Sequence, residues 1–363
     1  MNNYHKQSLP KIDVCYGSYA SVLRKFERFG CKNRFNGKNA KELESWQEDT
    51  RCLLQGLLGL DKMECAPLQP VQLESTMLSG GIRREHWRIR VEPDVWMTFY
   101  VLIPPGAGKS TCPVLCPPGH NGGGKYAVAG ADEYEAVAEK IQHYHYDYGL
   151  QLARMGYVAL CPDCRGFGER RESTEDAAAL PAFLKGDCAR LAHMGLPLGI
   201  PVAGMFVWDL MRLIDYVQQR GEWDKEHISC IGFSGGGMQT LLLAAVDMRI
   251  TFAMTSGYFY GYRDALLTMN TNCACNYIPH LWEHLDMGDI GCLIAPRPFL
   301  IQSCEADRLN GHRGIVNVTE QVEITQKAYD LLQQPQKLLH EICDGTHQFH
   351  TENLNKNLEI LLR

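Results

Sequence analysis

The sequence predicts an alpha/beta domain built around a mostly parallel sheet, and three observations carry that prediction. From residue 113 onwards, strand-like apolar runs alternate with helix-like segments, which indicates right-handed crossovers between parallel strands. Before residue 113 the pattern contains strands with no helices between them, which favours an antiparallel opening. The segments with polar, chemically useful residues all follow predicted strands, and the carboxyl ends of parallel strands are where functional loops are expected.

Length and charge define the broad class. A chain of 363 residues is long enough for one large domain or two smaller ones. Its 36 Lys and Arg against 42 Asp and Glu give a net charge of −6, which argues against a bulk affinity for nucleic acid or an anionic membrane. No apolar run approaches the ~20 residues of a membrane span, and the opening residues lack the apolar core of a secretory signal. We therefore expect a cytoplasmic protein without nucleic-acid or membrane partners.

The chain contains fifteen cysteines, an odd number without a repeating spacing. We interpret them as reduced thiols that mainly pack in the core. Two close pairs, Cys161-x-x-Cys164 and Cys273-x-Cys275, have spacings found in redox or zinc sites. Neither has a second pair or a nearby histidine at zinc-finger spacing, so we expect no metal and no cofactor.

Residues 1–65 are predicted to form a helical extension ahead of the alpha/beta domain at 66–363. A helix is expected over 41–58, with Gly59 as its stop. Its apolar face follows the 3.6-residue period and consists of Leu43, Trp46, Thr50, Leu53, Leu54 and Leu57.

The remaining elements follow in order. The three opening strands, with a turn at Gly80-Gly81, are predicted at 71–75, 85–91 and 97–105. Later strands are expected at 113–116, 157–161, 227–231, 252–255, 298–302 and 337–342. Helices are expected at 148–155, 205–218, 238–246 and 320–333, and a last helix carries Leu354, Leu358 and Leu361 on one face. Three insertions that could cover a site as a lid lie at about 125–147, 169–203 and 257–285.

Ser234 is the candidate nucleophile. The strand at 227–231 runs into Gly232-Phe-Ser-Gly-Gly-Gly237 and then into an apolar helix, which is the context that a nucleophile elbow requires. Flanking side chains would clash in so tight a turn, so glycines stand two residues before and two after the serine. A Gly-rich turn that binds phosphate is the alternative, but the Lys-Ser/Thr of a P-loop and the Rossmann glycine spacing are both missing.

A serine needs a base, and the base needs an acid that orients it. After a nucleophile elbow the acid and then the base follow along the chain. His347 is the favoured base because it follows the last predicted strand and Gly345 lets its loop bend back; His350 is the main alternative. Asp307, after the strand at 298–302, is the favoured acid, with Glu305 as the alternative.

The oxyanion of an acyl-transfer intermediate needs backbone donors. The Gly235 N–H stands at a helix N-terminus directly after the serine, where it is well placed to donate. A second donor is expected from the glycine-rich loop Pro118-Gly-His-Asn-Gly-Gly-Gly124, and we assign it to the His120 N–H. The His120 side chain could instead contact substrate or be an ordinary loop residue.

These motifs resemble the alpha/beta-hydrolase superfamily and, within it, the acetyl xylan esterase-like and dienelactone hydrolase-like branch. The similar stretches cover most of residues 110–350 and are PPGHNGGG, GYVALCPDCRGFGER, GFSGGGMQTLLLAAVDMRI, CNYIPHLWEHLDMGDIGCLIAPRPFL and DGTHQFH. The segment SWQEDTRCLLQGLLGL is similar to the helix that precedes the hydrolase core in such enzymes. The resemblance implies an alpha/beta-hydrolase fold with Ser234, Asp307 and His347 as its triad. It also implies that residues 163–168 form a structural turn, with Arg165 in an internal ion pair.

The sequence departs from these relatives at two places. The oxyanion loop carries Pro118-Gly119 where relatives often have His-Gly, and Asp307 is followed by Arg308-Leu-Asn310 where relatives often have proline and an apolar run. The second departure indicates a reshaped loop around the acid.

The pocket is less well defined by the sequence. Tyr258, Tyr260 and Asn276 are candidate substrate contacts, with aromatic packing as the alternative for the tyrosines. His143-x-His145 could bind a metal if it lies on a strand, but a polar, aromatic lip is the favoured interpretation. By resemblance, the expected activity is that of a serine esterase on short-chain esters such as acetylated sugars or xylo-oligosaccharides. The alternatives are an amide or peptide hydrolase, and a hydrolase-fold binding protein with little turnover.

Overall fold

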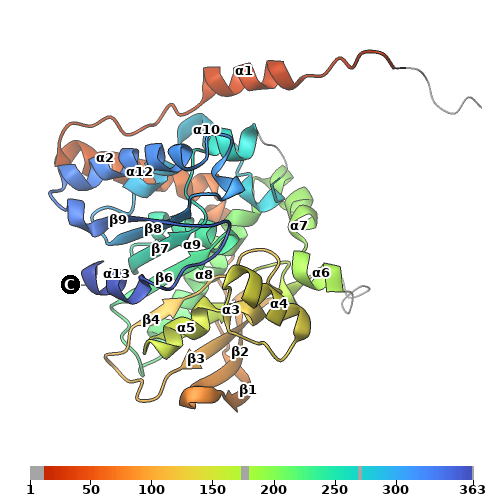
Figure 1. Ribbon diagram of the computed structural model, residues 1–363, viewed down its shortest axis with the longest axis vertical. Helices are drawn as coiled ribbons and strands as arrows, with labels where there is room; N and C mark the ends of the chain where they lie inside the picture. Colours follow the sequence, from red (N-terminus) through yellow and green to blue (C-terminus); the bar gives the residue numbers. More distant parts are fainter. Residues whose placement is uncertain (1–11, 173–179, 269–271, 362–363) are drawn as a thin grey trace, which may run out of the picture.

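A nine-stranded sheet in the order β1-β2-β3-β5-β4-β6-β7-β8-β9 runs through the protein (Figure 1). The computed structural model describes residues 12–172, 180–268 and 272–361. The start of the predicted extension and parts of the predicted insertions at 169–203 and 257–285 lie outside the described residues. The predicted alpha/beta architecture is confirmed.

The opening strands are antiparallel, as predicted. They are β1 (Val71–Met77), β2 (Arg83–Glu92) and β3 (Val95–Ile103). The turn between β1 and β2 contains Gly80 and Gly81 at φ of 76° and 75°, a backbone conformation that glycine adopts without strain. The strand β3 also pairs antiparallel with β5, which joins this ribbon to the rest of the sheet.

The other strands are parallel to one another and are linked by helical crossovers. They are β4 (Pro113–Leu115), β5 (Val158–Pro162), β6 (Ile228–Phe233), β7 (Ile250–Ser256), β8 (Phe299–Cys304) and β9 (Leu338–Cys343). All of them fall within a few residues of the predicted ranges. Because the strands are parallel, the loops after β4, β6, β8 and β9 meet at one edge of the sheet.

Two hydrophobic cores lie on opposite faces of the sheet. The first is covered by α2 (Ala40–Leu57), α8 (Val202–Gln219), α9 (Gly235–Val246), α11 (Met287–Cys292) and α12 (Ile315–Leu331). The second is covered by α3 (Lys125–Val128), α5 (Tyr148–Arg154) and α13 (Leu354–Leu361), together with α4 (Glu135–Tyr144). The remaining helices are α1 (Tyr19–Phe29), α6 (Leu180–Lys185), α7 (Cys188–Gly195) and α10 (Leu281–His284). In Figure 1, α7 and, below it, α6 are drawn to the right of the strands.

The helix predicted over 41–58 is α2, and it is part of the first core. The Asn39 side chain caps its start by accepting a hydrogen bond from the Glu42 N–H. Leu43 and Leu54 are fully buried, whereas Trp46, Leu53 and Leu57 of the predicted face are half-buried. The extension therefore packs on the same core as the sheet.

The helix α1 lies at the outside of the molecule (Figure 1), and none of its residues is buried. The last turn of α1 is held by Trp282 of α10, whose indole N–H donates to the Phe26 carbonyl at 2.9 Å. The backbone of Cys31 donates in turn to the Trp282 carbonyl at 2.7 Å. These contacts fasten the extension to the third predicted insertion.

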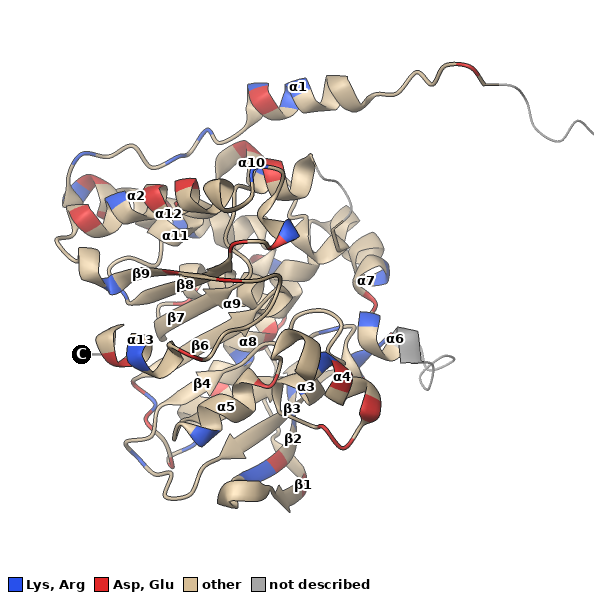
Figure 2. Cartoon of the chain, viewed as in Figure 1, with Lys and Arg blue, Asp and Glu red and all other residues tan. Residues whose placement is uncertain are grey.

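Charged residues of both signs are mixed along helices such as α1 and α2 (Figure 2). Within the described residues, no single helix is long and apolar enough to cross a membrane. One bent pair, Cys188–Leu198 with Val202–Gln219, meets the length and composition requirement only when its two halves, 96° apart, are taken together.

Arg165 forms the internal ion pair that the resemblance implied. Its guanidinium contacts Asp209 of α8 at 2.9 Å and Glu92 at 2.6 Å, and Arg170 reaches the same Asp209 at 2.6 Å. The Asp209 side chain is 3% exposed, so removal of its charge would leave two arginines poorly compensated. This network fixes the turn after β5 against α8.

We expect Asp209→Asn to lower the free energy of unfolding by about 3 kcal/mol, because an uncompensated buried charge is costly. Urea unfolding measures this value. The matched control is Glu320→Gln, which removes the charge from an exposed pair with Arg313 and should cost less than about 1 kcal/mol. Equal losses in the two variants would contradict the assigned role of the buried network.

The loss in Asp209→Asn should also depend on pH. Burial raises the pKa of Asp209, but the charges of Arg165 and Arg170 outweigh it and lower the pKa below its usual value. The carboxylate therefore stabilises the fold above the unfolded-state pKa of about 3.9, and this contribution is lost as the pH falls through the folded-state pKa. The difference between wild type and Asp209→Asn should shrink below about pH 4; an undiminished difference there would count against this explanation.

Candidate active site

Ser234 lies in a sharp turn between β6 and α9. Its backbone has φ of 57° and ψ of −123°, a conformation that is unusual for a residue with a side chain. The Ser234 N–H donates to the Ser256 carbonyl of β7 at 2.8 Å, and the Ser234 carbonyl accepts from Met238 at 3.1 Å in the first turn of α9. The strain is held by the surrounding sheet and helix, and the residue is half-buried.

The glycines on either side of this turn are required by space. A Cβ on Gly232 would lie 2.2 Å from the Gly236 carbonyl oxygen, and a Cβ on Gly236 would lie 2.0 Å from the Pro117 carbonyl oxygen. Both distances are far below van der Waals contact. The turn can therefore close only with glycine at these positions, which is the reason given for them in the sequence analysis.

Asp307 and His347 meet although they are separated by 40 residues. The His347 Nδ1 donates to the Asp307 Oδ2 at 2.6 Å, and the Asp307 side chain is 1% exposed. The residues after the acid form a short turn, Arg308–Asn310, which Asp307 caps through its other oxygen by accepting from the Leu309 N–H at 2.8 Å. The residues of this turn are those at which the sequence differs from the relatives after Asp307.

The His347 ring is held beside the serine turn. Its centroid is 4.5 Å from that of Phe233, the residue before Ser234, and the two ring planes are tilted by 32°. Gly257 lies beneath the ring, where a Cβ would come within 2.9 Å of His347 Cε1. Because Nδ1 contacts Asp307, Nε2 is the nitrogen left to act on a neighbouring group.

The two alternatives lie elsewhere. Glu305 is exposed. The Nδ1 of His350 lies 3.4 Å from a carboxylate oxygen of Glu352, and its ring centroid is 6.1 Å from that of His145. The geometry thus brings His347, rather than His350, to Asp307.

The loop after β4 packs closely on the start of α9. A Cβ on Gly119 would lie 2.9 Å from the Gly235 nitrogen. The Gln239 side chain donates to the Pro118 carbonyl at 2.8 Å, and the Tyr146 hydroxyl donates to the His120 carbonyl at 2.8 Å. Within the described residues, the backbone N–H groups of His120 and Gly235 donate to no protein acceptor. Both predicted oxyanion donors are therefore adjacent to Ser234 and available to a ligand.

A buried ion pair that the sequence analysis missed supports this loop. Lys125, at the start of α3, is fully buried, and its Nζ contacts Asp163 at 2.6 Å and Glu169 at 2.9 Å. Burial raises the pKa of Glu169, but the His86 imidazole, 3.4 Å away, and the charge of Lys125 lower it overall. The partners are 38 and 44 residues from Lys125, a spacing without local periodicity that could have predicted the pair.

The predicted substrate contacts lie inside the protein. Tyr258 and Asn276 are at most 5% exposed, and the Asn276 side-chain amide donates to the Cys273 carbonyl at 3.1 Å. Tyr260 is 1% exposed, and its hydroxyl has no hydrogen-bond partner among the described residues. Burial, and then the negative charge of Asp307, raise the pKa of Tyr260 well above its usual value.

His143 and His145 do not lie on a strand. His143 is in the last turn of α4, and His145 follows it as the cap residue with φ of 52°. The His145 ring contacts the Phe349 carbonyl at 3.0 Å. A metal site was expected here only if both histidines lay on a strand. They do not, because the helix α4 continues to Tyr144.

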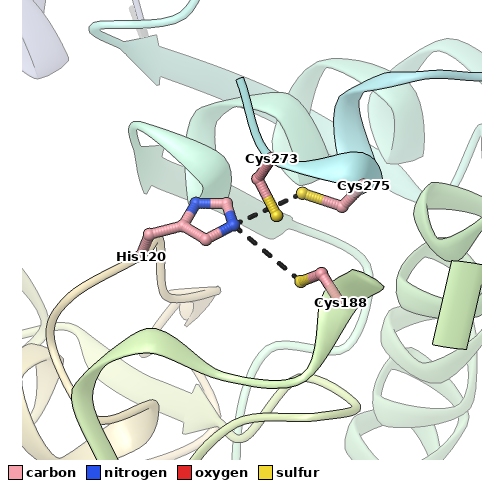
Figure 3. Close-up of side chains that lie close together, drawn as sticks. All are labelled: His120, Cys188, Cys273 and Cys275. Atoms are coloured by element: carbon pink, nitrogen blue, oxygen red, sulfur yellow. Dashed lines mark hydrogen bonds between the residues drawn. The ribbon is translucent and has the colours of Figure 1, made fainter. Parts of the chain in front are cut away.

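The His120 side chain lies in a cluster that the sequence analysis also missed. Its Nε2 is 3.4 Å from the Cys275 Sγ and 3.9 Å from the Cys188 Sγ (Figure 3). Cys273 completes a group of four ligand atoms, all within 4.8 Å of one another. The Cys273-x-Cys275 spacing was the available signal. It could not predict the cluster, because His120 is 155 residues from Cys275 and 68 residues from Cys188 in the chain.

The sheet order, the strained serine turn and the Asp–His pair after β8 and β9 define an alpha/beta hydrolase. Comparison with protein families gives the particular family: the model of the Abhydrolase family matches residues 13–342, and the chain belongs to this family.

Individual relatives are more distant. A Bacillus subtilis (strain 168) protein named as a hydrolase, YtaP, is 26% identical over 229 residues, which are 61% of this chain and 69% of the relative. Among solved structures, a Bacteroides fragilis protein named as an acetyl xylan esterase superposes with a TM-score of 0.74 at 21% identity, over 96% of this chain and 90% of the other. A glucuronoyl esterase from Solibacter usitatus has a TM-score of 0.64 at 14% identity, over 92% and 96%. Both structures share the fold of this chain.

We expect Gly236→Ala to destabilise the protein by more than about 2 kcal/mol, because the added methyl group would overlap the Pro117 carbonyl. The control is Gly221→Ala, where no atom lies within 4 Å of the new Cβ and the change should be neutral or stabilising by up to about 1 kcal/mol. Thermal and urea unfolding measure both variants. A Gly236→Ala protein as stable as the control would show that the turn can open without cost.

Proposed function

We propose that the protein is a serine esterase that cleaves carboxylic esters through an acyl-enzyme. The observation that carries this proposal is the Asp307–His347 hydrogen bond of 2.6 Å, formed by a histidine that lies against the residue before Ser234. Nucleophilic acyl transfer needs a serine, an imidazole that takes its proton and a carboxylate that orients the imidazole. Membership of a hydrolase family supports the same reaction class.

Each residue has a defined task in the proposed mechanism. His347 Nε2 takes the proton of the Ser234 hydroxyl as its oxygen attacks the ester carbonyl. Asp307 keeps the proton of the imidazole on Nδ1 and stabilises the imidazolium. The Gly235 and His120 N–H groups donate to the oxyanion of the tetrahedral intermediate. His347 then protonates the leaving alcohol and activates the water that hydrolyses the acyl-enzyme.

We infer that the substrate is a small ester of a carbohydrate, with an acetylated sugar or xylo-oligosaccharide as the leading choice. Two structural neighbours are named for carbohydrate esters, one as an acetyl xylan esterase and one as a glucuronoyl esterase. These names belong to the neighbours and guide the choice of substrates to assay. A cytoplasmic location would favour small oligosaccharides over a polymer.

Ser234→Ala is expected to lower ester hydrolysis by roughly 10⁶-fold in kcat, because the nucleophile is lost. The assay uses nitrophenyl esters from acetate to octanoate, followed by acetylated and methyl-esterified oligosaccharides. We expect acetate to be the best simple substrate, with turnover falling as the acyl chain lengthens. If the wild type and the alanine variant hydrolyse every ester equally, the activity does not depend on this serine and the proposal is wrong.

Matched variants test the acid and the base separately. Asp307→Asn should lower kcat by about 10⁴-fold, since the wrong imidazole tautomer would be favoured, while Glu305→Gln should leave kcat/KM unchanged. His347→Asn should be nearly inactive, while His350→Asn should retain activity. Circular dichroism checks that all four proteins are folded. Loss of activity in Glu305→Gln or His350→Asn, with retention in its counterpart, would reverse the corresponding assignment.

A further inference from the structure

Four potential metal ligands converge beside the serine turn. They come from three separate segments: the loop after β4 supplies His120, the first residue of α7 is Cys188, and the third predicted insertion supplies Cys273 and Cys275. Their ligand atoms all lie within 4.8 Å of one another. In Figure 3 the imidazole ring and the three sulfur atoms point toward one common space.

The separations match the size of a tetrahedral zinc site. Bond lengths of about 2.3 Å to sulfur and about 2.0–2.1 Å to nitrogen give a nitrogen–sulfur separation of about 3.5 Å at the tetrahedral angle. The His120 Nε2 lies 3.4 Å from the Cys275 Sγ and 3.9 Å from the Cys188 Sγ. Small side-chain adjustments would therefore place all four atoms around one ion.

The chemistry of the donors favours zinc over harder cations. Three thiols and an imidazole are the soft and borderline ligands that zinc prefers, whereas Mg²⁺ and Ca²⁺ take oxygen ligands. Cys188 and Cys275 are buried, and His120 and Cys273 are half-buried. Thiols are weak hydrogen-bond partners for an imidazole, so ordinary packing would leave His120 Nε2 poorly satisfied. A bound cation would satisfy the nitrogen and all three sulfur atoms together.

We propose that His120 Nε2 and the sulfur atoms of Cys188, Cys273 and Cys275 bind a structural Zn²⁺ ion. Four protein ligands fill the tetrahedral coordination shell, which is the pattern of a structural site and leaves no position for a catalytic water. On binding, the three thiols release their protons and coordinate as thiolates. The inference goes beyond the proposed esterase activity, because no step of that mechanism requires the ion.

The site would tie the predicted insertions at 169–203 and 257–285 to the oxyanion loop. The Cys273–Cys275 segment is already braced by Asn276, which accepts a hydrogen bond from the Tyr262 hydroxyl on its backbone carbonyl. Ligation through Nε2 leaves the imidazole proton of His120 on Nδ1. That nitrogen lies over the start of α9, 3.0 Å from the Cβ position of Gly235. The ion would thus hold in place the loop that carries the predicted second oxyanion donor.

Metal analysis of the full-length protein tests the proposal. Protein purified without chelators should contain about one zinc ion per chain by inductively coupled plasma mass spectrometry. Cys188→Ser and Cys275→Ser should each lose most of this zinc after dialysis. The matched control is Cys230→Ser, which alters a buried thiol outside the cluster that is hydrogen-bonded to Thr240 and should keep the ion. Ser234→Ala should also keep its zinc, so the zinc content tests the metal site independently of the esterase proposal.

X-ray absorption of the wild type decides the question even if the cysteine variants fail to fold. The expected zinc shell has three sulfur atoms at about 2.3 Å and one nitrogen at about 2.0–2.1 Å. A protein that binds no zinc when reconstituted under reducing conditions would overturn the proposal. So would a shell of oxygen and nitrogen alone, or a native disulfide between two of these cysteines detected by mass spectrometry before reduction.

Discussion

The close fit of the loop after β4 against the start of α9 is the constraint on which the rest of the site depends. The strands β4 and β6 are parallel neighbours, so their following loops meet directly. At that meeting the Pro117 carbonyl and Gly236 approach so closely that no side chain fits between them, and a Cβ on Gly119 would lie 2.9 Å from the Gly235 nitrogen. This backbone contact sets the turn at Ser234 and keeps two backbone donors beside it.

The proposed acid and base are supplied by the other half of the sheet. The parallel pairing of β8 with β9 aligns their ends, and the loops that follow bring Asp307 to His347. The Phe233 ring contacts the histidine ring beside the serine turn. Gly257 leaves room for the histidine ring because it has no side chain. Each of these loops begins at the end of a paired strand, which fixes the starting position of the side chain that it carries.

Buried charges and the proposed zinc ion stabilise the loops around this centre. Asp209 and Glu92 together offset the charges of Arg165 and Arg170 behind the turn after β5. Asp163 and Glu169 both contact the ammonium group of Lys125 beside the loop after β4. A buried charge without its partner is costly, so each ion pair keeps the two segments that carry its charges together. A zinc ion at His120 would extend the same kind of cross-link to α7 and the third predicted insertion.

The sequence alone determined the order of strands and helices, because apolar periodicity and glycine turns are local properties of the chain. It also predicted Ser234, Asp307 and His347, since an elbow and the strand ends after it limit the choices. Only the tertiary structure decided which histidine meets the acid and that Tyr258 and Asn276 are buried. It alone revealed the Lys125 ion pair and the cysteine cluster around His120. The physical reason is that these contacts join residues far apart in the chain, and only the packing of crossovers and insertions on the sheet brings them together.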